Sequence, residues 1–180
     1  MIHVKTAIKH LQPILLQSVF GVVVSIVLIA ISPTSVWMMK PTTMSNVIHP
    51  TTWLAINVWM EARGESYRGK LGVAFATMNR LADSNRRWGK TIEDVIWQQF
   101  QYSWTNPSDA NRMKLDDIDW KDPAFIESHK AASAAYYRLS PDPTNGANHY
   151  LNPNAIAKLP DWYAKGKVTA VIDKHEFLKL

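Results

Sequence analysis

The sequence predicts an α+β domain that is mainly α-helical, with a small β element near the C-terminus and a transmembrane helix in front of the domain. Three observations predict this architecture. An uncharged apolar stretch lies near the N-terminus, apolar residues recur at helical spacing through the middle of the chain, and a turn-forming run then precedes short β-prone segments. With 180 residues, the chain has room for one domain and an appendage.

The apolar stretch near the N-terminus is long enough to cross a bilayer. Residues 11–39 contain no charged side chain, and a spanning helix needs about 20 mainly apolar residues. We therefore predict a transmembrane or signal-anchor helix at residues 14–36 in the inner membrane. Lys5 and Lys9 precede it, so the positive-inside rule places residues 1–13 in the cytoplasm and the rest of the chain in the periplasm.

A cleaved signal peptide is the alternative, because it also combines a basic start with an apolar stretch. Residues 30–32 offer only a weak cleavage signature, since Pro33 follows them, and we favour an uncleaved anchor. Residues 37–50 turn to Pro, Thr, Ser and Asn, which is typical of a linker. The domain proper then occupies residues 51–180.

Four helices are expected in the first part of this domain. Thr91, followed three residues later by Asp94, resembles a capping box. Asp122 and Pro123 combine a capping residue with proline in the first turn. The expected helices are residues 51–62 with Thr51 or Thr52 as cap, residues 67–82 with an apolar stripe facing the core, a short helix from Thr91, and residues 122–139.

The turn-forming run at residues 140–146 ends the helical part, because its prolines, asparagine and glycine disfavour a helix. Short β-prone segments follow at residues 149–151 and 168–172. Residues 175–178 are expected to continue the second of these strands. We therefore predict a small sheet as the C-terminal β element.

The composition excludes several classes of function. The chain has no cysteine, which rules out disulfides, thiolate metal sites and a cysteine nucleophile. The net charge of +5 includes no basic run typical of nucleic-acid binding, so no nucleic-acid partner is expected. His149 and His175 lack metal-ligand spacing and no serine-hydrolase motif occurs, so we expect neither a metal site nor a cofactor.

Glu61 is the candidate catalytic residue on physical grounds. On the first helix it shares a face with Leu54 and Val58, so burial is expected to raise the pKa of its carboxyl. Cleavage of a glycosidic bond needs such an acid to protonate the leaving oxygen. A surface ion pair between Glu61 and Arg63 is the alternative.

Aromatic residues give a second indication, because the chain contains 8 Trp and sugar rings stack on such side chains. The candidates for sugar contacts lie in segments that we expect to be loops: Tyr102, Trp104, Tyr150 and Trp162. The tryptophans on expected helices are assigned to the core instead: Trp53, Trp59 and Trp97.

Five motifs occur in order between residues 59 and 177. They are Trp59-Met60-Glu61-Ala62-Arg63-Gly64-Glu65, residues 69–80 ending in Asn79-Arg80, Val95-Ile96 leading to Gln101-Tyr102-Ser103-Trp104, residues 146–153 around His149-Tyr150, and His175-Glu176-Phe177. In these motifs the sequence resembles the cell wall hydrolase family named for the spore-cortex-lytic enzyme SleB. Departures from the family pattern are Trp59 for Tyr, Gly72 for Ala, and the acidic stretch at residues 109–122, which we cannot match.

The resemblance implies a lysozyme-like fold for residues 51–180. It also implies that the substrate is peptidoglycan, cut between N-acetylmuramic acid and N-acetylglucosamine, with Glu61 as the catalytic acid. The motif positions expected to bind the glycan are Gln101, Tyr102, Ser103, Trp104, His149, Tyr150 and Asn152.

The reaction type has two candidates. The resemblance favours lytic transglycosylation, in which Glu61 donates its proton and then takes the proton of the muramic O6 hydroxyl, giving 1,6-anhydro ends. Hydrolysis by a muramidase requires a second carboxylate. Glu65 is close in sequence, but Gly64 is expected to end the helix between them, so their geometry is not predictable.

Other roles fit the same features. A membrane-anchored module that binds peptidoglycan without cutting it would need the anchor and the aromatics but not Glu61. For an enzyme, a phage endolysin of the signal-anchor type, released to lyse the host, and a permanently tethered wall-remodelling enzyme both remain candidates.

Overall fold

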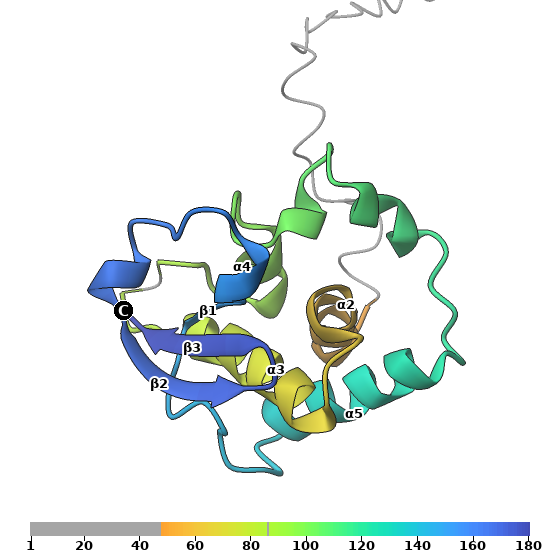
Figure 1. The fold of residues 1–180 in the computed structure, drawn as a ribbon. Coiled ribbons are helices and arrows are strands. Elements are labelled where there is room, and N and C mark those ends of the chain that lie inside the picture. The colour runs from red at the N-terminus through yellow and green to blue at the C-terminus, as the bar shows by residue number, and fades with distance from the viewer. Residues whose placement is uncertain (1–47, 86) are drawn as a thin grey trace, which may run out of the picture. The chain divides into compact units, whose positions relative to one another are not determined.

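The computed structural model describes residues 48–85 and 87–180, so the predicted segments 1–13 and 14–36 and most of 37–50 lie outside it. Figure 1 shows helices gathered around α2, with a three-stranded sheet to one side. No helix in the described ranges is long and apolar enough to span a bilayer. In chain order the elements are α2 (Pro50–Ala62), α3 (Tyr67–Leu81), α4 (Ile92–Trp97), η1 (Ser103–Thr105), η2 (Ala110–Leu115), α5 (Pro123–Tyr136), β1 (His149–Leu151), η3 (Pro153–Ala155), η4 (Tyr163–Lys165), β2 (Lys167–Ile172) and β3 (His175–Lys179), where η marks a 3-10 helix.

α2 is the central helix, and α3 and α5 pack against it. Its Leu54 and Val58 are fully buried, which confirms the face predicted from their spacing. The helix begins at Pro50, and its cap is His49 rather than a threonine: His49 Nδ1 accepts a hydrogen bond from the Thr51 N–H at 3.3 Å. The acceptor at this helix start is a histidine ring nitrogen, whereas the usual acceptor is a side-chain oxygen of Ser, Thr, Asp or Asn. Capping preferences therefore do not point to His49.

α3 and α4 form where they were predicted. α3 ends at Leu81, and its cap is Ser66, whose Oγ accepts from the Gly69 N–H at 3.2 Å. α4 opens with the predicted capping box, because Thr91 Oγ1 accepts from the Asp94 N–H at 3.1 Å and Asp94 Oδ2 accepts from the Thr91 N–H at 3.1 Å. These bonds satisfy first-turn amides that have no partner within the helix.

α5 begins after its predicted cap, Asp122, but it ends at Tyr136 and not at residue 139. Arg138 adopts a left-handed backbone conformation with φ 55°. The Leu139 N–H then bonds back to the Ala134 carbonyl at 2.8 Å, which is the pattern that closes many helices. Glycine usually occupies the left-handed position at a helix end, and with Arg138 there instead, this end is not visible in the sequence.

The C-terminal β element is a three-stranded antiparallel sheet with the strand order β1-β3-β2. Its last strand, β3, is separate from β2, which corrects the expectation that residues 175–178 continue β2. Asp173 has φ 52°, so the chain reverses there and the two strands pair as a hairpin. The Asp173 carboxylate also accepts from the Ser66 N–H at 3.0 Å and the Ser66 hydroxyl at 2.7 Å, which ties this turn to the start of α3.

Phe177 of β3 joins the sheet to α3. Its buried ring lies against Gly72, where a Cβ would come within 2.7 Å of the ring Cζ. This close approach explains the glycine at a position where the family resemblance leads us to expect alanine. Phe177 also pairs with Tyr150 of β1 in the sheet register, so the packing of β3 on α3 fixes the place of Tyr150.

Candidate active site

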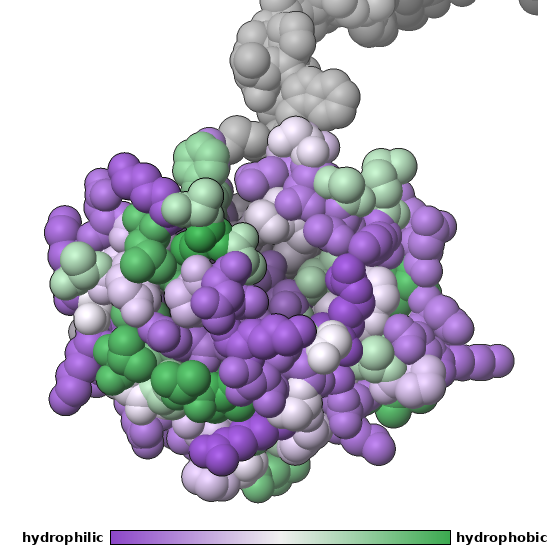
Figure 2. Space-filling model, viewed as in Figure 1, coloured by the Kyte–Doolittle hydropathy of each residue, from purple (hydrophilic) through white to green (hydrophobic). Residues whose placement is uncertain are grey.

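Glu61 and Tyr150 meet at the carboxyl end of α2. Glu61 is the penultimate residue of that helix, and the Tyr150 hydroxyl donates a hydrogen bond to Glu61 Oε2 at 3.1 Å. Figure 2 shows the surface hollowed over α2, between the segment that carries η1 and η2 and the segment that carries η3. The helix and the sheet therefore bring together two residues that the sequence separates by 89 positions.

Burial raises the pKa of the Glu61 carboxyl from 4.5 to about 7. The hydrogen bond from Tyr150 and the charge of Arg80 oppose this rise, whereas the charge of Asp109 adds to it. Burial also raises the pKa of Tyr150 above its ordinary value, so its hydroxyl stays protonated and remains a donor. Near neutral pH the Glu61 carboxyl is present in both forms, which suits a group that must give a proton and take one back.

Arg63 does not form the surface ion pair with Glu61 that was the alternative reading of this helix end. Its Nη1 donates to the Met60 carbonyl at 3.3 Å, and its Nη2 donates to Asn111 Oδ1 at 3.4 Å. The guanidinium lies over the Trp59 ring, 5.2 Å from the ring centroid. Arg63 thus links the end of α2 to η2, and the Glu61 carboxyl accepts its hydrogen bond from Tyr150 instead.

A buried hydrogen-bond network lies one turn before Glu61 on α2. Asn57 Oδ1 accepts from Trp104 Nε1 at 2.9 Å, and Asn57 Nδ2 donates to Thr77 Oγ1 at 3.3 Å. Thr77 Oγ1 lies 2.9 Å from the Tyr102 hydroxyl. These four side chains are buried, and a satisfied network in a low-dielectric interior holds its members in one arrangement.

Tyr102 and Trp104 are predicted site residues whose side chains lie in the core. They are only 2% and 1% exposed. The loop expected at Trp104 is the 3-10 helix η1, which turns the indole inward to pack edge-on against Trp97 with centroids 5.6 Å apart. Neither ring offers a face to a sugar in this structure, so we assign both residues to support beneath the site.

An aromatic group around His149, the neighbour of Tyr150 in β1, also contains Trp88 and Trp162. The His149 ring centroid lies 5.8 Å from that of Trp88 and 4.9 Å from that of Trp162. Burial lowers the pKa of His149 to about 4, and the charges of Arg80 and Arg87 act in the same direction. The imidazole is therefore neutral at neutral pH. Within residues 48–85 and 87–180, no three His, Asp or Glu side chains are placed to hold a metal ion.

The other predicted site residues have defined partners or lie at the surface. Gln101 Oε1 accepts from Trp88 Nε1 at 3.2 Å, which connects it to the aromatic group. Asn152 Oδ1 accepts from the Asn154 N–H at 3.0 Å and so caps η3. Ser103 is exposed at the start of η1.

Asp109, rather than Glu65, is the carboxylate whose charge acts on Glu61. Asp109 caps η2, where its Oδ1 accepts from the Asn111 N–H at 2.7 Å. It belongs to the acidic stretch that the family pattern did not match. Glu65 lies beyond the end of α2, where its charge acts on His175.

Sequence reasoning missed several residues of this region. Asn57 and Thr77 are polar residues at core positions of helices, and buried polar groups need specific partners. That pattern was the available signal for both. Arg80 lies in the second of the five motifs, but the sequence does not indicate what it does there. The missed residues are Asn57, Thr77, Arg80, Trp88 and Asp109.

Comparisons with known proteins agree with this fold. A family model described as Cell Wall Hydrolase matches residues 64–178, so Glu61 lies just before the matched range. The catalytic domain of the germination-specific lytic transglycosylase SleB from Bacillus anthracis is similar, with 25% identity over 72% of this chain and 93% of that chain, and a TM-score of 0.55. The catalytic domain of the Bacillus cereus SleB protein shares 23% identity over 72% of this chain and 89% of that chain, with a TM-score of 0.52.

No curated protein matches the chain. The structural likenesses confirm the predicted mainly helical, lysozyme-like fold.

Proposed function

Because the chain belongs to the cell wall hydrolase family, we propose that it is a lytic transglycosylase that cuts peptidoglycan between N-acetylmuramic acid and N-acetylglucosamine. The Glu61 carboxyl carries this proposal: it is held by Tyr150 at 3.1 Å, and its pKa is raised to about 7. A binding module would gain nothing from burying a carboxyl at a cost in solvation. An acid that gives and recovers a proton needs this environment.

In the proposed reaction, Glu61 acts alone as acid and then as base. Its proton passes to the glycosidic oxygen of the departing N-acetylglucosamine while the bond from that oxygen to muramic C1 breaks. The muramic O6 hydroxyl then bonds to C1 and gives its proton to the Glu61 carboxylate. The product carries a 1,6-anhydro ring, and the carboxyl returns to its starting form without consuming water.

The other surface residues of the site would position the glycan. We place the sugar rings beside Trp162 and His149, which form the aromatic group with Trp88. Gln101, Ser103 and Asn152, which the family motifs mark, would supply hydrogen bonds to the glycan. Tyr102 and Trp104 would act indirectly, through the buried network that fixes α2.

Hydrolysis is the second candidate, because the charge of Asp109 acts on Glu61. A second carboxylate would take a proton from water as water attacks C1, or would itself attack C1. In that case Asp109→Asn should abolish turnover. The matched variant Asp117→Asn alters an exposed acid of the same stretch and should leave turnover unchanged.

Mass spectrometry of the products separates the two reactions. The full-length chain is incubated with purified sacculi, and the released muropeptides are weighed. We expect anhydro-muramic ends, which are lighter than reducing ends by one water. Products with reducing ends only, together with an inactive Asp109→Asn variant, would replace transglycosylation by hydrolysis. Binding of the wild type to sacculi without any released product would contradict both.

For the cellular location, we propose that residues 14–36 anchor the chain in the inner membrane with the catalytic domain in the periplasm. The uncharged, apolar sequence of the segment supports this. Fractionation of cells before and after collapse of the membrane potential tests it. Recovery in the membrane under both conditions would support a tethered remodelling enzyme, release after collapse would support an endolysin, and soluble protein throughout would contradict the anchor.

A further inference from the structure

Arg80 is a buried cation without a carboxylate partner in the described part of the chain. The residue lies in the last turn of α3 and is 5% exposed. Its Nε donates to the Asn148 carbonyl at 2.6 Å, but its Nη1 is buried with no hydrogen-bond partner. An unpaired charge in a protein interior costs several kcal/mol, so the position of Arg80 needs an explanation beyond packing.

Aromatic rings and a rigid strand end hold the Arg80 guanidinium in place. It lies over the Tyr102 ring at 5.0 Å and near the Trp88 ring at 5.9 Å from their centroids. Asn148, which accepts from Arg80, is itself fixed: its Nδ2 donates to the Leu180 carbonyl at 2.9 Å, and its Oδ1 accepts from the Leu180 N–H at 3.0 Å. The cation therefore has little freedom to reach the surface.

Asn148, the acceptor of Arg80, lies two residues before Tyr150, which donates to Glu61. From this place the charge of Arg80 acts on three titratable groups of the site. It favours the ionised form of Glu61 and that of Tyr150, and it disfavours protonation of His149. The other charged or titratable groups that act on them are Asp109 on Glu61, Arg87 on His149, and Glu61 and Tyr102 on Tyr150.

We propose that Arg80 is the internal counter-charge of Glu61: it stabilises the carboxylate that remains after the acid has given up its proton, and it does so without touching the glycan. Arg80 is thus a positioning residue that acts through Glu61. This inference rests on the proposed function, because it assigns the charge a part in the proton transfer.

The counter-charge explains why an unpaired cation is kept in this place. In the form that starts the reaction, Glu61 carries its proton and Arg80 has no anion to pair with. When the proton passes to the leaving oxygen, a buried carboxylate forms on which the charge of a fixed cation acts, and charges interact more strongly in a water-poor site than in water. Burial lowers the pKa of His149 and the charge of Arg80 acts in the same direction, so His149 is neutral and does not compete as a second acid at neutral pH.

The test compares removal of the charge with retention of the charge, in the full-length chain. Arg80→Gln removes it and Arg80→Lys keeps it, while both can still donate to the Asn148 carbonyl. Carbon-13 NMR of labelled glutamate, assigned with Glu61→Gln, gives the titration midpoint of Glu61 without substrate. In Arg80→Gln we expect this midpoint to rise from about 7 by roughly one pH unit or more. In Arg80→Lys it should stay close to that of the wild type.

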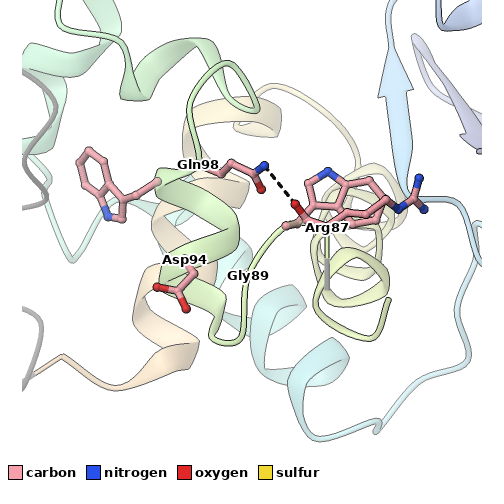
Figure 3. Close-up of a pocket in the computed structure, with 6 residues that line it drawn as sticks. Arg87, Gly89, Asp94 and Gln98 are labelled. Atoms are coloured by element: carbon pink, nitrogen blue, oxygen red, sulfur yellow. Dashed lines mark hydrogen bonds between the residues drawn. The ribbon is translucent and has the colours of Figure 1, made fainter. Parts of the chain in front are cut away.

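Arg87→Gln is the matched control. Arg87 also lies over Trp88, at 4.3 Å, but it is exposed and paired with Asp83 at 3.0 Å. Figure 3 shows it beside a surface hollow, where its carbonyl accepts from Gln98 Nε2 at 3.1 Å. Its removal should leave the Glu61 midpoint unchanged.

Kinetics on sacculi supply the second readout. Arg80→Gln should lower kcat by about tenfold or more with little change in KM, because the charge acts on the reacting proton and not on binding. Arg80→Lys should recover most of the loss.

A readout on the wild type covers the case in which Arg80→Gln fails to fold. The nitrogen-15 resonance of the Arg80 side chain, assigned with Arg80→Lys, should titrate with the midpoint of Glu61, and Glu61→Gln should abolish this titration. An Arg80 resonance that ignores Glu61, or a folded Arg80→Gln variant with an unchanged Glu61 midpoint, would overturn the inference. An active Glu61→Gln variant would instead overturn the proposed function, whatever the Arg80 measurements show.

Discussion

The Tyr150 hydroxyl donates to Glu61 Oε2 at 3.1 Å, and this bond connects the sheet to the end of α2. Two consequences follow for the carboxyl. One oxygen is occupied by a donor, which leaves the other to carry the exchangeable proton. The donor also stabilises the carboxylate and limits the rise in pKa that burial causes.

Tyr150→Phe should therefore move the titration of Glu61 upward from about 7. We expect the alkaline limb of the pH–rate profile on sacculi to shift to higher pH, and kcat to fall about tenfold, as expected for loss of one hydrogen bond to a charged group. Tyr163→Phe is the matched control, since the hydroxyl of this η4 residue donates to Glu176 Oε2 of β3 at 2.5 Å. Identical profiles for Tyr150→Phe and the wild type would contradict the assignment.

Folding stability should depend on pH through Glu61. Folding raises the pKa of this carboxyl from 4.5 to about 7, so the folded chain holds the proton more tightly than the unfolded chain. The resulting stabilisation is complete below about pH 4.5 and is lost as the pH rises through 7. A shift of this size corresponds to about 3 kcal/mol.

Urea denaturation of the wild type and Glu61→Gln at a series of pH values tests this dependence. The free energy of unfolding of the wild type should fall relative to the variant as the pH rises through this window. His149, whose pKa is lowered to about 4, gives the opposite trend, because its contribution is lost as the pH falls. Both the wild type and Glu61→Gln contain His149, so its contribution cancels in the difference between their free energies of unfolding. Parallel curves for the two proteins would show that the Glu61 carboxyl is not withdrawn from water.

Asn57→Ala should destabilise the domain by about 2–3 kcal/mol, because it leaves the buried Trp104 Nε1 without its acceptor. Trp104 Nε1 now donates to Asn57 at 2.9 Å, and Thr77 accepts from Asn57 at 3.3 Å. Asn154→Ala, at an exposed position, should change the free energy of unfolding by no more than about 0.5 kcal/mol. Equal urea midpoints for the two variants would contradict the structural role of the network.

Gly72→Ala should lower the free energy of unfolding although alanine is the better helix former. The added Cβ would lie 2.7 Å from the Phe177 ring Cζ, and the ring is fully buried. We expect a net loss of about 1–2 kcal/mol from overpacking. Gly64→Ala is the control, because nothing lies within 4 Å of its added Cβ. A stabilised Gly72→Ala variant would mean that the Phe177 ring yields.

Local sequence signals predicted most of the helical framework. The capping box at Thr91 and the Asp122-Pro123 start formed as expected, because both depend on residues only a few positions apart. The helix end at Arg138 and the reversal at Asp173 were not predictable in this way. Each needs a left-handed residue, and tertiary contacts such as that between Asp173 and Ser66 select it there.

The candidate site was predictable only in part. Spacing marked the face that Glu61 shares with Leu54 and Val58, but the donor that meets its carboxyl comes from a strand 89 residues later. The Trp104 indole points inward and donates to Asn57, a buried polar residue of α2 that lies 47 positions away in the sequence. Hydrogen bonds between residues so far apart in the chain produce no periodic pattern in a single sequence.

The most direct test of the central assignment is muropeptide release from purified sacculi by full-length Glu61→Gln. We expect turnover to fall at least about 100-fold, as is typical for loss of a general acid, while sacculus binding and the urea midpoint at acidic pH are retained. Glu65→Gln, in the same motif but beyond the end of α2, should keep wild-type turnover. Near-normal release by Glu61→Gln would contradict the assignment of Glu61 as the catalytic acid.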